Sequence, residues 1–366
     1  MQTPKVPTAK IASMLNEHTI VLTLKFSVVT IAVVALYFQD LTMIFTGALN
    51  DESTFHILAI PFLFGYLLYR KRHMITASLQ PQTSARGFQR YFSVLSGVCL
   101  CAVAILMYWY GSYSFTPLEF HMITLPFLAA GLVLILFSTQ TLKQLLFPIA
   151  FLIFLTPPPS EILFGVGSAL STISASASNG LANVFGMHAV LSSINGSPLI
   201  TLIKPDGTSL PFSVDVACSG IYSIIGFVIF ALFIAYIMSG SRLRQKAAIL
   251  VMGIPLIIGL NIIRITTILA IGYNFGENLA LQVFHTVGAT VLMFIGTLIL
   301  LAVTEKAFKK PPPIQPCLAC TSTPVNSTES FCSNCGRLFK YPRLSVNRAD
   351  VVKVVGIVVV VHVQRT

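Results

Sequence analysis

Apolar stretches recur along most of this chain, and short charged loops separate them. A helix that spans a bilayer needs about 20 mainly apolar residues. Only 10% of the 366 residues are charged and 55% are hydrophobic, whereas soluble proteins carry about 25% charged residues. A water-soluble core cannot hide this much apolar surface, so the sequence predicts an all-α polytopic membrane protein with about eight transmembrane helices. The expected spans lie at 21–38, 55–69, 91–110, 119–137, 143–156, 217–238, 247–268 and 285–303.

The basic residues mark one side of the membrane. Arg70–Arg72 lie between the second and third expected spans, and Arg242 and Arg244 lie between the sixth and seventh. The alternate loops hold acidic residues instead, among them Asp40, Asp51 and Glu52. The positive-inside rule then places both termini in the cytoplasm of a multi-pass cell-membrane protein. The net charge of +11 fits a basic face against anionic lipid, and no nucleic-acid partner is expected.

Two segments between the expected spans are not ordinary membrane helices. Residues 161–186 are apolar but rich in Ser, Ala and Gly, and they follow Pro157–Pro159. We expect an amphipathic or re-entrant helix on the outer face, with a true span as the alternative. Residues 189–216 are β-prone and contain turn signals at 195–196 (Asn-Gly) and 205–207 (Pro-Asp-Gly). They predict a small extracytoplasmic β-hairpin that leads the chain to Cys218.

Under this topology, three candidate catalytic residues lie at the same face of the membrane. Cys218 opens the sixth span, Arg264 lies near the outer end of the seventh, and His285 opens the eighth. A thiol becomes a strong nucleophile as thiolate, and its pKa falls beside a cation or at a helix N-terminus. His285 can transfer a proton near neutral pH, and Arg264 can stabilise a thiolate or an oxyanion. Taken singly, a packing cysteine, an anchoring arginine and an interfacial histidine remain the alternatives.

Three motifs in order resemble those of the exosortase/archaeosortase family. They are Ala-Cys-Ser-Gly-Ile-Tyr-Ser at 217–223, Asn-Ile-Ile-Arg at 261–264 and Phe-His at 284–285. The resemblance covers about residues 20–305. It implies a membrane Cys transpeptidase that cleaves C-terminal sorting signals of secreted proteins and transfers the new C-terminus to a lipid or similar acceptor through a thioester.

The resemblance also implies residue roles and partners. Cys218 would be the nucleophile, Arg264 and His285 would complete the triad, and the surrounding motif residues Ser219, Gly220 and Asn261 would position them. The implied substrates carry a short motif, a transmembrane helix and a basic tail, and catalysis needs no cofactor. A hydrolytic Cys protease of the same fold is one alternative function, and a non-enzymatic transporter or scaffold is another.

Four cysteines beyond the membrane region have metal-ligand spacing. Cys317 and Cys320 form one pair, Cys332 and Cys335 form the other, and eleven residues lie between the pairs. Four thiolates in two pairs suit structural zinc, and the cytoplasmic position argues against two disulfides. A zinc ribbon here could recruit a cytoplasmic protein partner. The expected organisation is a tail at 1–20, the transmembrane domain at 21–305, a linker at 306–316, the cytoplasmic zinc ribbon at 317–337 and a β-prone tail at 338–366, for which a partial ninth span is the alternative.

Overall fold

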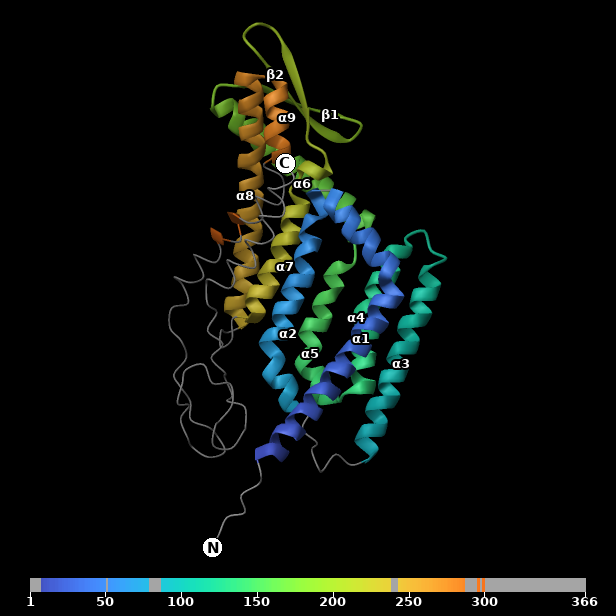
Figure 1. Cartoon of the computed structure of the whole chain (residues 1–366). Helices are drawn as coiled ribbons and strands as arrows, with labels where there is room; N and C mark the ends of the chain where they lie inside the picture. Colours follow the sequence, from blue (N-terminus) through green and yellow to red (C-terminus); the bar gives the residue numbers. More distant parts are fainter. Residues whose placement is uncertain are drawn as a thin grey trace. The chain divides into compact units, whose positions relative to one another are not determined.

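The chain folds into helices and one small antiparallel sheet (Figure 1). The computed structural model describes residues 8–50, 52–78, 87–237, 243–286, 295–296 and 298–299. The helices are α1 (Thr8–Asn50), α2 (Ala59–Ser78), α3 (Gly87–Gly111), α4 (Pro117–Leu136), α5 (Thr139–Phe151), α6 (Ser160–Val184), α7 (Ile221–Ile237), α8 (Leu243–Phe275) and α9 (Glu277–Thr286). Three 3-10 turns join them: η1 (Glu52–Leu58), η2 (Leu152–Leu155) and η3 (Val216–Cys218). The predicted helical class is confirmed, and the zinc-ribbon cysteines and the C-terminal tail lie outside the described residues.

Four described helices are long and apolar enough to cross a membrane. They are Ile20–Asn50, Arg90–Gly111, Pro117–Leu136 and Lys246–Phe275. The pair Thr139–Leu155 and Ser160–Val184 passes the same test together, as a broken span or a re-entrant loop, and would raise the number to 5. The apolar helix α7 is shorter, and the eighth expected span extends beyond the described residues. The chain is therefore a multi-pass membrane protein, and the number eight remains a prediction.

The first helix differs from its prediction. The expected span ended at residue 38 and left Asp40 in a loop, but α1 continues to Asn50. Asp40 is a buried helical residue with 8% exposure. Its carboxylate is paired with His121 of α4, and pairing offsets the cost of burying a charge. The acidic residue was therefore misleading as a loop marker.

The described chain divides into two compact units. Unit 1 comprises Met1–Gly47 and Ile60–Pro158, and unit 2 comprises Ala48–Ala59 and Pro159–Thr366. Unit 1 contains α3 and α4, which pack along each other. Unit 2 contains α6, α7, α8, α9 and the sheet.

The sheet of unit 2 is a three-stranded meander. Strands β1 (His188–Ile194), β2 (Ser197–Ile203) and β3 (Ser209–Ser213) pair antiparallel in the order β1-β2-β3. Asn195 and Gly196 have φ of 52° and 84°, as a two-residue hairpin turn requires. In the second turn, Asp206 Oδ1 accepts a hydrogen bond of 2.9 Å from the Thr208 amide. Both turn signals are confirmed, and the predicted hairpin is extended by a third strand.

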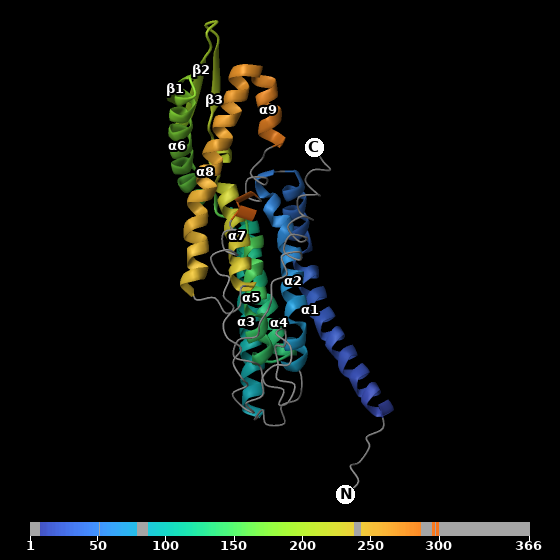
Figure 2. The same cartoon turned by 90° about the vertical axis from the view of Figure 1, so that its left-hand side faces the viewer.

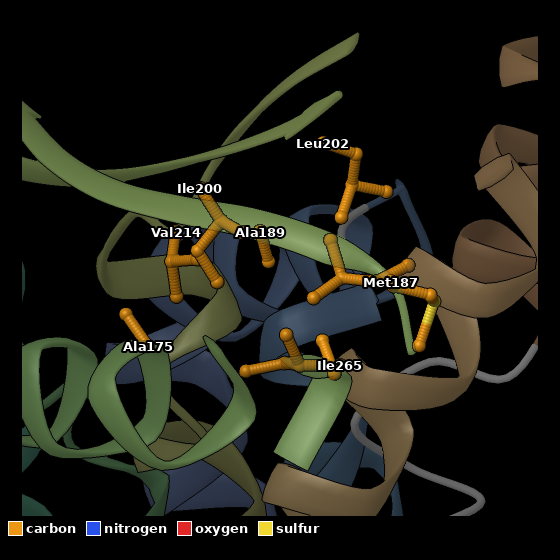
Figure 3. Packing of buried hydrophobic residues seen from close by; sticks show 9 residues of the cluster. Ala175, Met187, Ala189, Ile200, Leu202, Val214 and Ile265 are labelled. Carbon is orange, nitrogen blue, oxygen red and sulfur yellow. The ribbon is translucent and has the colours of Figure 1, made fainter. Parts of the chain in front are cut away.

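The sheet covers a core that also contains the cysteine loop. Side chains of β2, α6 and α8 project toward one another (Figure 3). The buried members are Ala175, Ala182, Met187, Ala189, Ile200, Leu202, Val214, Ile265 and Leu269. Cys218 packs against this cluster. The position of the thiol is thus set by a sheet and two helices in one unit.

Candidate active site

Cys218 ends a 3-10 turn and does not open a long helix. The η3 turn covers Val216–Cys218, and α7 begins only at Ile221. Between them, Ser219 Oγ donates to the Val216 carbonyl at 2.6 Å and accepts from the Ile221 amide at 3.3 Å. Gly220 has a φ of 86°, which turns the chain into α7. The expectation that Cys218 is the first residue of the helix is wrong, because this glycine separates the two.

Asn261 of α8 holds the cysteine loop from the other side. Its side chain is fully buried, with 0% exposure. Its Nδ2 donates to the Cys218 carbonyl at 3.0 Å and to Ser174 Oγ at 3.3 Å. A Cβ placed on Gly220 would lie 2.9 Å from Asn261 Cγ. The structure therefore brings together Cys218 and all three predicted motif residues, Ser219, Gly220 and Asn261.

Three buried serines on one face of α6 also support the cysteine loop and α8. Ser171 Oγ donates to the Val214 carbonyl, and Ser174 Oγ donates to the Ser219 carbonyl at 3.5 Å. Ser178 Oγ donates to the Ile262 carbonyl of α8 at 3.2 Å. None of these serines was predicted as a site residue from the sequence. Their spacing of three and four residues, which gives one helix face, was the available signal.

Arg264 lies one helical turn after Asn261 on the same side of α8. It is buried, with 6% exposure. It was expected near the end of its span, but α8 continues to Phe275. The additional turns are stabilised because Leu269, Ala270 and Tyr273 pack against the core beneath the sheet.

The electrostatics at Cys218 combine opposing effects. Burial raises the pKa of the Cys218 thiol above its ordinary value, and the positive charge of Arg264 opposes that shift. A backbone hydrogen bond of Asp215 also lowers this pKa, and the Asp215 carboxylate raises it. The charge of Arg264 therefore favours the thiolate.

His285 lies in α9, on the return leg of a helical hairpin. The hairpin turns at Gly276, whose φ is 96°, and α9 packs back along α8 (Figure 2). His285 was expected to open a helix, but its helix already begins at Glu277. At about 1.5 Å per residue, the His285 backbone is about 14 Å from the hairpin turn and that of Arg264 about 18 Å. The two backbones therefore lie within about one helical turn of each other in depth.

The remaining cysteines and metal candidates lie elsewhere. Cys99 and Cys101 are free thiols of α3, in unit 1. Among residues that the structure describes, no group of three or more His, Cys, Asp or Glu side chains could hold a metal ion. The four predicted zinc ligands are outside that part of the chain.

The described residues combine several membrane helices with a thiol on a loop and a buried arginine whose charge acts on that thiol. The family comparison identifies the class of protein. The family model for transmembrane exosortases matches residues 48–302. The chain belongs to this family, and membership implies a membrane sorting transpeptidase. The match includes Cys218, Arg264 and His285 but ends before the cysteine pairs at 317–335. No curated protein and no solved structure matches the chain.

Proposed function

We propose that this exosortase cleaves the C-terminal sorting signal of secreted proteins and transfers the new C-terminus to a lipid or similar acceptor. The observation that carries the proposal is the clamp that Asn261 places on the Cys218 loop, one helical turn before the buried Arg264 on α8. Asn261 binds the Cys218 carbonyl, and the charge of Arg264 acts on the Cys218 thiol. A packing cysteine needs neither a clamp on its own backbone nor a buried cation.

The chemistry follows from these groups. The Cys218 thiolate attacks the scissile carbonyl, and Arg264 stabilises the resulting oxyanion. The amide C–N bond breaks, His285 gives a proton to the leaving amine, and a thioester to Cys218 remains. The acceptor hydroxyl or amine then attacks the thioester and loses its proton to His285, and the C–S bond breaks to release Cys218 as the thiolate.

Asn261, Ser219 and Gly220 are positioning residues in this proposal. Asn261 holds the loop carbonyl, Ser219 closes the turn after Cys218, and Gly220 leaves room for Asn261. Ser174 supports Asn261 from α6. None of these groups needs to touch the substrate, since each acts through the Cys218 backbone.

A processing assay tests the proposal. The full chain is co-expressed with secreted proteins that carry a C-terminal motif, a transmembrane helix and a basic tail, and intact masses are compared. We expect the tail to be lost with wild type and with Cys101→Ala, and to remain with Cys218→Ala. Equal processing by wild type and Cys218→Ala would exclude this mechanism.

The product mass separates transfer from hydrolysis. A new C-terminus with added mass supports transfer to an acceptor, whereas a free carboxylate supports the alternative Cys protease. No processing of any tested motif by folded wild type would favour the transporter or scaffold alternative.

We further propose structural zinc in the cytoplasmic ribbon formed by Cys317, Cys320, Cys332 and Cys335. Four thiolates leave no open coordination position, so the metal would organise a docking module for a cytoplasmic partner. The test is the zinc content of the purified chain, for which we expect one equivalent. Cys317→Ser with Cys320→Ser should remove it, and Cys99→Ser with Cys101→Ser should not.

The proposed orientation has both termini in the cytoplasm and Cys218 on the extracytoplasmic face. Asp206 lies in the exposed turn between β2 and β3, so Asp206→Cys offers a reporter position in the same unit as Cys218. We expect an impermeant maleimide to label this cysteine in intact cells. Labelling only after the cells are opened would contradict the orientation.

A further inference from the structure

A second polar cluster lies in unit 1, where Asp40, His121 and Ser112 form a chain of side-chain contacts. His121 Nδ1 lies 2.9 Å from Asp40 Oδ1. His121 Nε2 lies 3.0 Å from Ser112 Oγ. The proposed sorting chemistry uses none of these residues.

The Asp40 carboxylate, the His121 imidazole and the Ser112 hydroxyl therefore follow one another in a chain of contacts. An ionised Asp40 only accepts hydrogen bonds, so His121 donates through Nδ1 and keeps Nε2 as an acceptor. Ser112 can then donate its proton to Nε2. This is the arrangement by which a histidine base activates a serine hydroxyl and a carboxylate orients the base.

Burial is graded along the chain of contacts. Asp40 and His121 are each 8% exposed, whereas Ser112 is an exposed residue in the connection after α3. The Tyr108 hydroxyl donates to Asp40 Oδ2 at 3.0 Å, and its ring stacks on His121 with centroids 3.8 Å apart. The base and its carboxylate are thus fixed by neighbours, and the nucleophile is open to a substrate.

Packing alone does not require the contact between Ser112 and His121. The Ser112 hydroxyl is also within 3.2 Å of the Tyr108 carbonyl of its own helix, and an exposed hydroxyl can bond to water. A structural pair of Asp40 and His121 would need only some partner for His121 Nε2, whereas a hydrolase site needs an exposed hydroxyl at that place.

The surroundings of Ser112 indicate the substrate class. Four aromatic residues on the same connection or the adjoining end of α3 are exposed: Trp109 62%, Tyr110 66%, Tyr113 77% and Phe115 108%. Trp and Tyr concentrate where a membrane meets water. An amphiphile with its ester group at that level would reach Ser112 while its acyl chain stays in lipid.

We propose that Ser112, His121 and Asp40 form a second catalytic site, a serine hydrolase site for acyl esters at the membrane surface. Ser112 Oγ attacks the ester carbonyl and its proton passes to His121. The alcohol leaves with that proton, and the acyl group stays on Ser112. Water then attacks the acyl-serine, His121 takes and returns its proton, and the carboxylic acid is released.

An alkyl fluorophosphonate tests this site directly. Ser112 would bond to phosphorus, fluoride would leave, and His121 would take the proton. The full chain is purified in detergent as Cys218→Ala, so the sorting site makes no contribution and failure here leaves the sorting proposal untouched. The adduct is located by peptide mass, and labelling rates are compared among variants.

The expected results are specific to the contact chain. Ser112→Ala should lose the adduct, and Ser114→Ala, a neighbouring serine bonded to Gly111, should label at the unchanged rate. His121→Gln should label at least about 100-fold more slowly, the usual effect of losing a general base. Hydrolysis of p-nitrophenyl octanoate in micelles should follow the same order.

Three results would overturn the proposal. They are no adduct on Ser112 of a folded chain, labelling of Ser112→Ala at the parent rate, and labelling of folded His121→Gln at the parent rate. Ser112→Ala removes only an exposed hydroxyl, so it keeps the test decisive if His121→Gln fails to fold.

Discussion

Unit 1 and unit 2 hold their buried polar groups in different ways. In unit 1, Asp40, His121 and Tyr108 bond side chain to side chain across helices. In unit 2, Asn261 and Ser174 bond mainly to the backbone of the cysteine loop. The first pattern fixes side chains directly. The second fixes a loop and leaves the thiol of Cys218, the proposed nucleophile, outside the set of supporting bonds.

The largest expected effect is on the stability of unit 1. Asp40→Leu leaves the buried His121 ring N–H and the Tyr108 hydroxyl without their shared acceptor, and each unsatisfied buried group costs about 1–3 kcal/mol. Replacing both partners removes the unpaired ring N–H, so Asp40→Leu with His121→Phe should be more stable than Asp40→Leu alone. Unfolding of the purified variants in detergent measures both, and a double variant less stable than the single one would contradict this account.

The next effect concerns the clamp in unit 2. Asn261→Ala removes the donor to the Cys218 carbonyl, and a buried unsatisfied group costs about 1–3 kcal/mol. We expect processing to fall more than stability does, because the loop that carries the proposed nucleophile loses its support. Ser174→Ala should also lower processing and stability, but by less than Asn261→Ala does. If Asn261→Ala lowers the stability of the chain as much as Asp40→Leu does, the proposed difference between the two units is contradicted.

A smaller effect is expected for alanine at two glycines, and comparing them distinguishes backbone strain from a side-chain contact. Gly207 and Gly220 have nearly equal φ of 83° and 86°, so an alanine at either pays about 1–2 kcal/mol for the left-handed conformation. Only Gly220 has Asn261 within 4 Å of the added Cβ. Gly220→Ala should therefore impair processing, and Gly207→Ala should lower stability alone. Equal processing by the two variants would show that the close approach to Asn261 has no role.

The smallest effect is a shift in pH dependence. Burial raises the pKa of the Cys218 thiol and Arg264 lowers it. Removing the cation in Arg264→Gln should raise this pKa further, so alkylation of Cys218 by iodoacetamide should require higher pH. The rate is followed on the Cys218 peptide by mass. Lys204→Gln removes a charge from the same unit and should leave the profile unchanged.

Local signals in the sequence predicted much of unit 2. The turn residues at 195–196 and 205–207 were enough to locate both turns of the sheet, because few other residues adopt positive φ at such low cost. The motifs around Cys218 and Asn261 predicted which residues would meet. The two additional turns of α8 beyond the expected span were missed, because they depend on the packing of residues such as Leu269 beneath the sheet, and no local pattern reveals that contact.

Unit 1 was predicted less well, for a physical reason. Asp40 and His121 are far apart in sequence. Asp40 alone resembles a residue of a polar loop, and His121 lies near one end of its expected span at 119–137. Only their pairing makes burial acceptable, and pairing across helices leaves no trace in periodicity. The α6 serines are an intermediate case, because their helical spacing was visible but their partners were not.

The core beneath the sheet has a consequence for the lipid environment. Membrane helices tilt or shift when bilayer thickness does not match their apolar length. The residues that hold Cys218 in place are buried by protein, through the sheet, α6 and α8. The site should therefore tolerate hydrophobic mismatch. A change in bilayer thickness should move these elements as one body and leave the distances among the Cys218 thiol, the Asn261 amide and the Arg264 guanidinium unchanged.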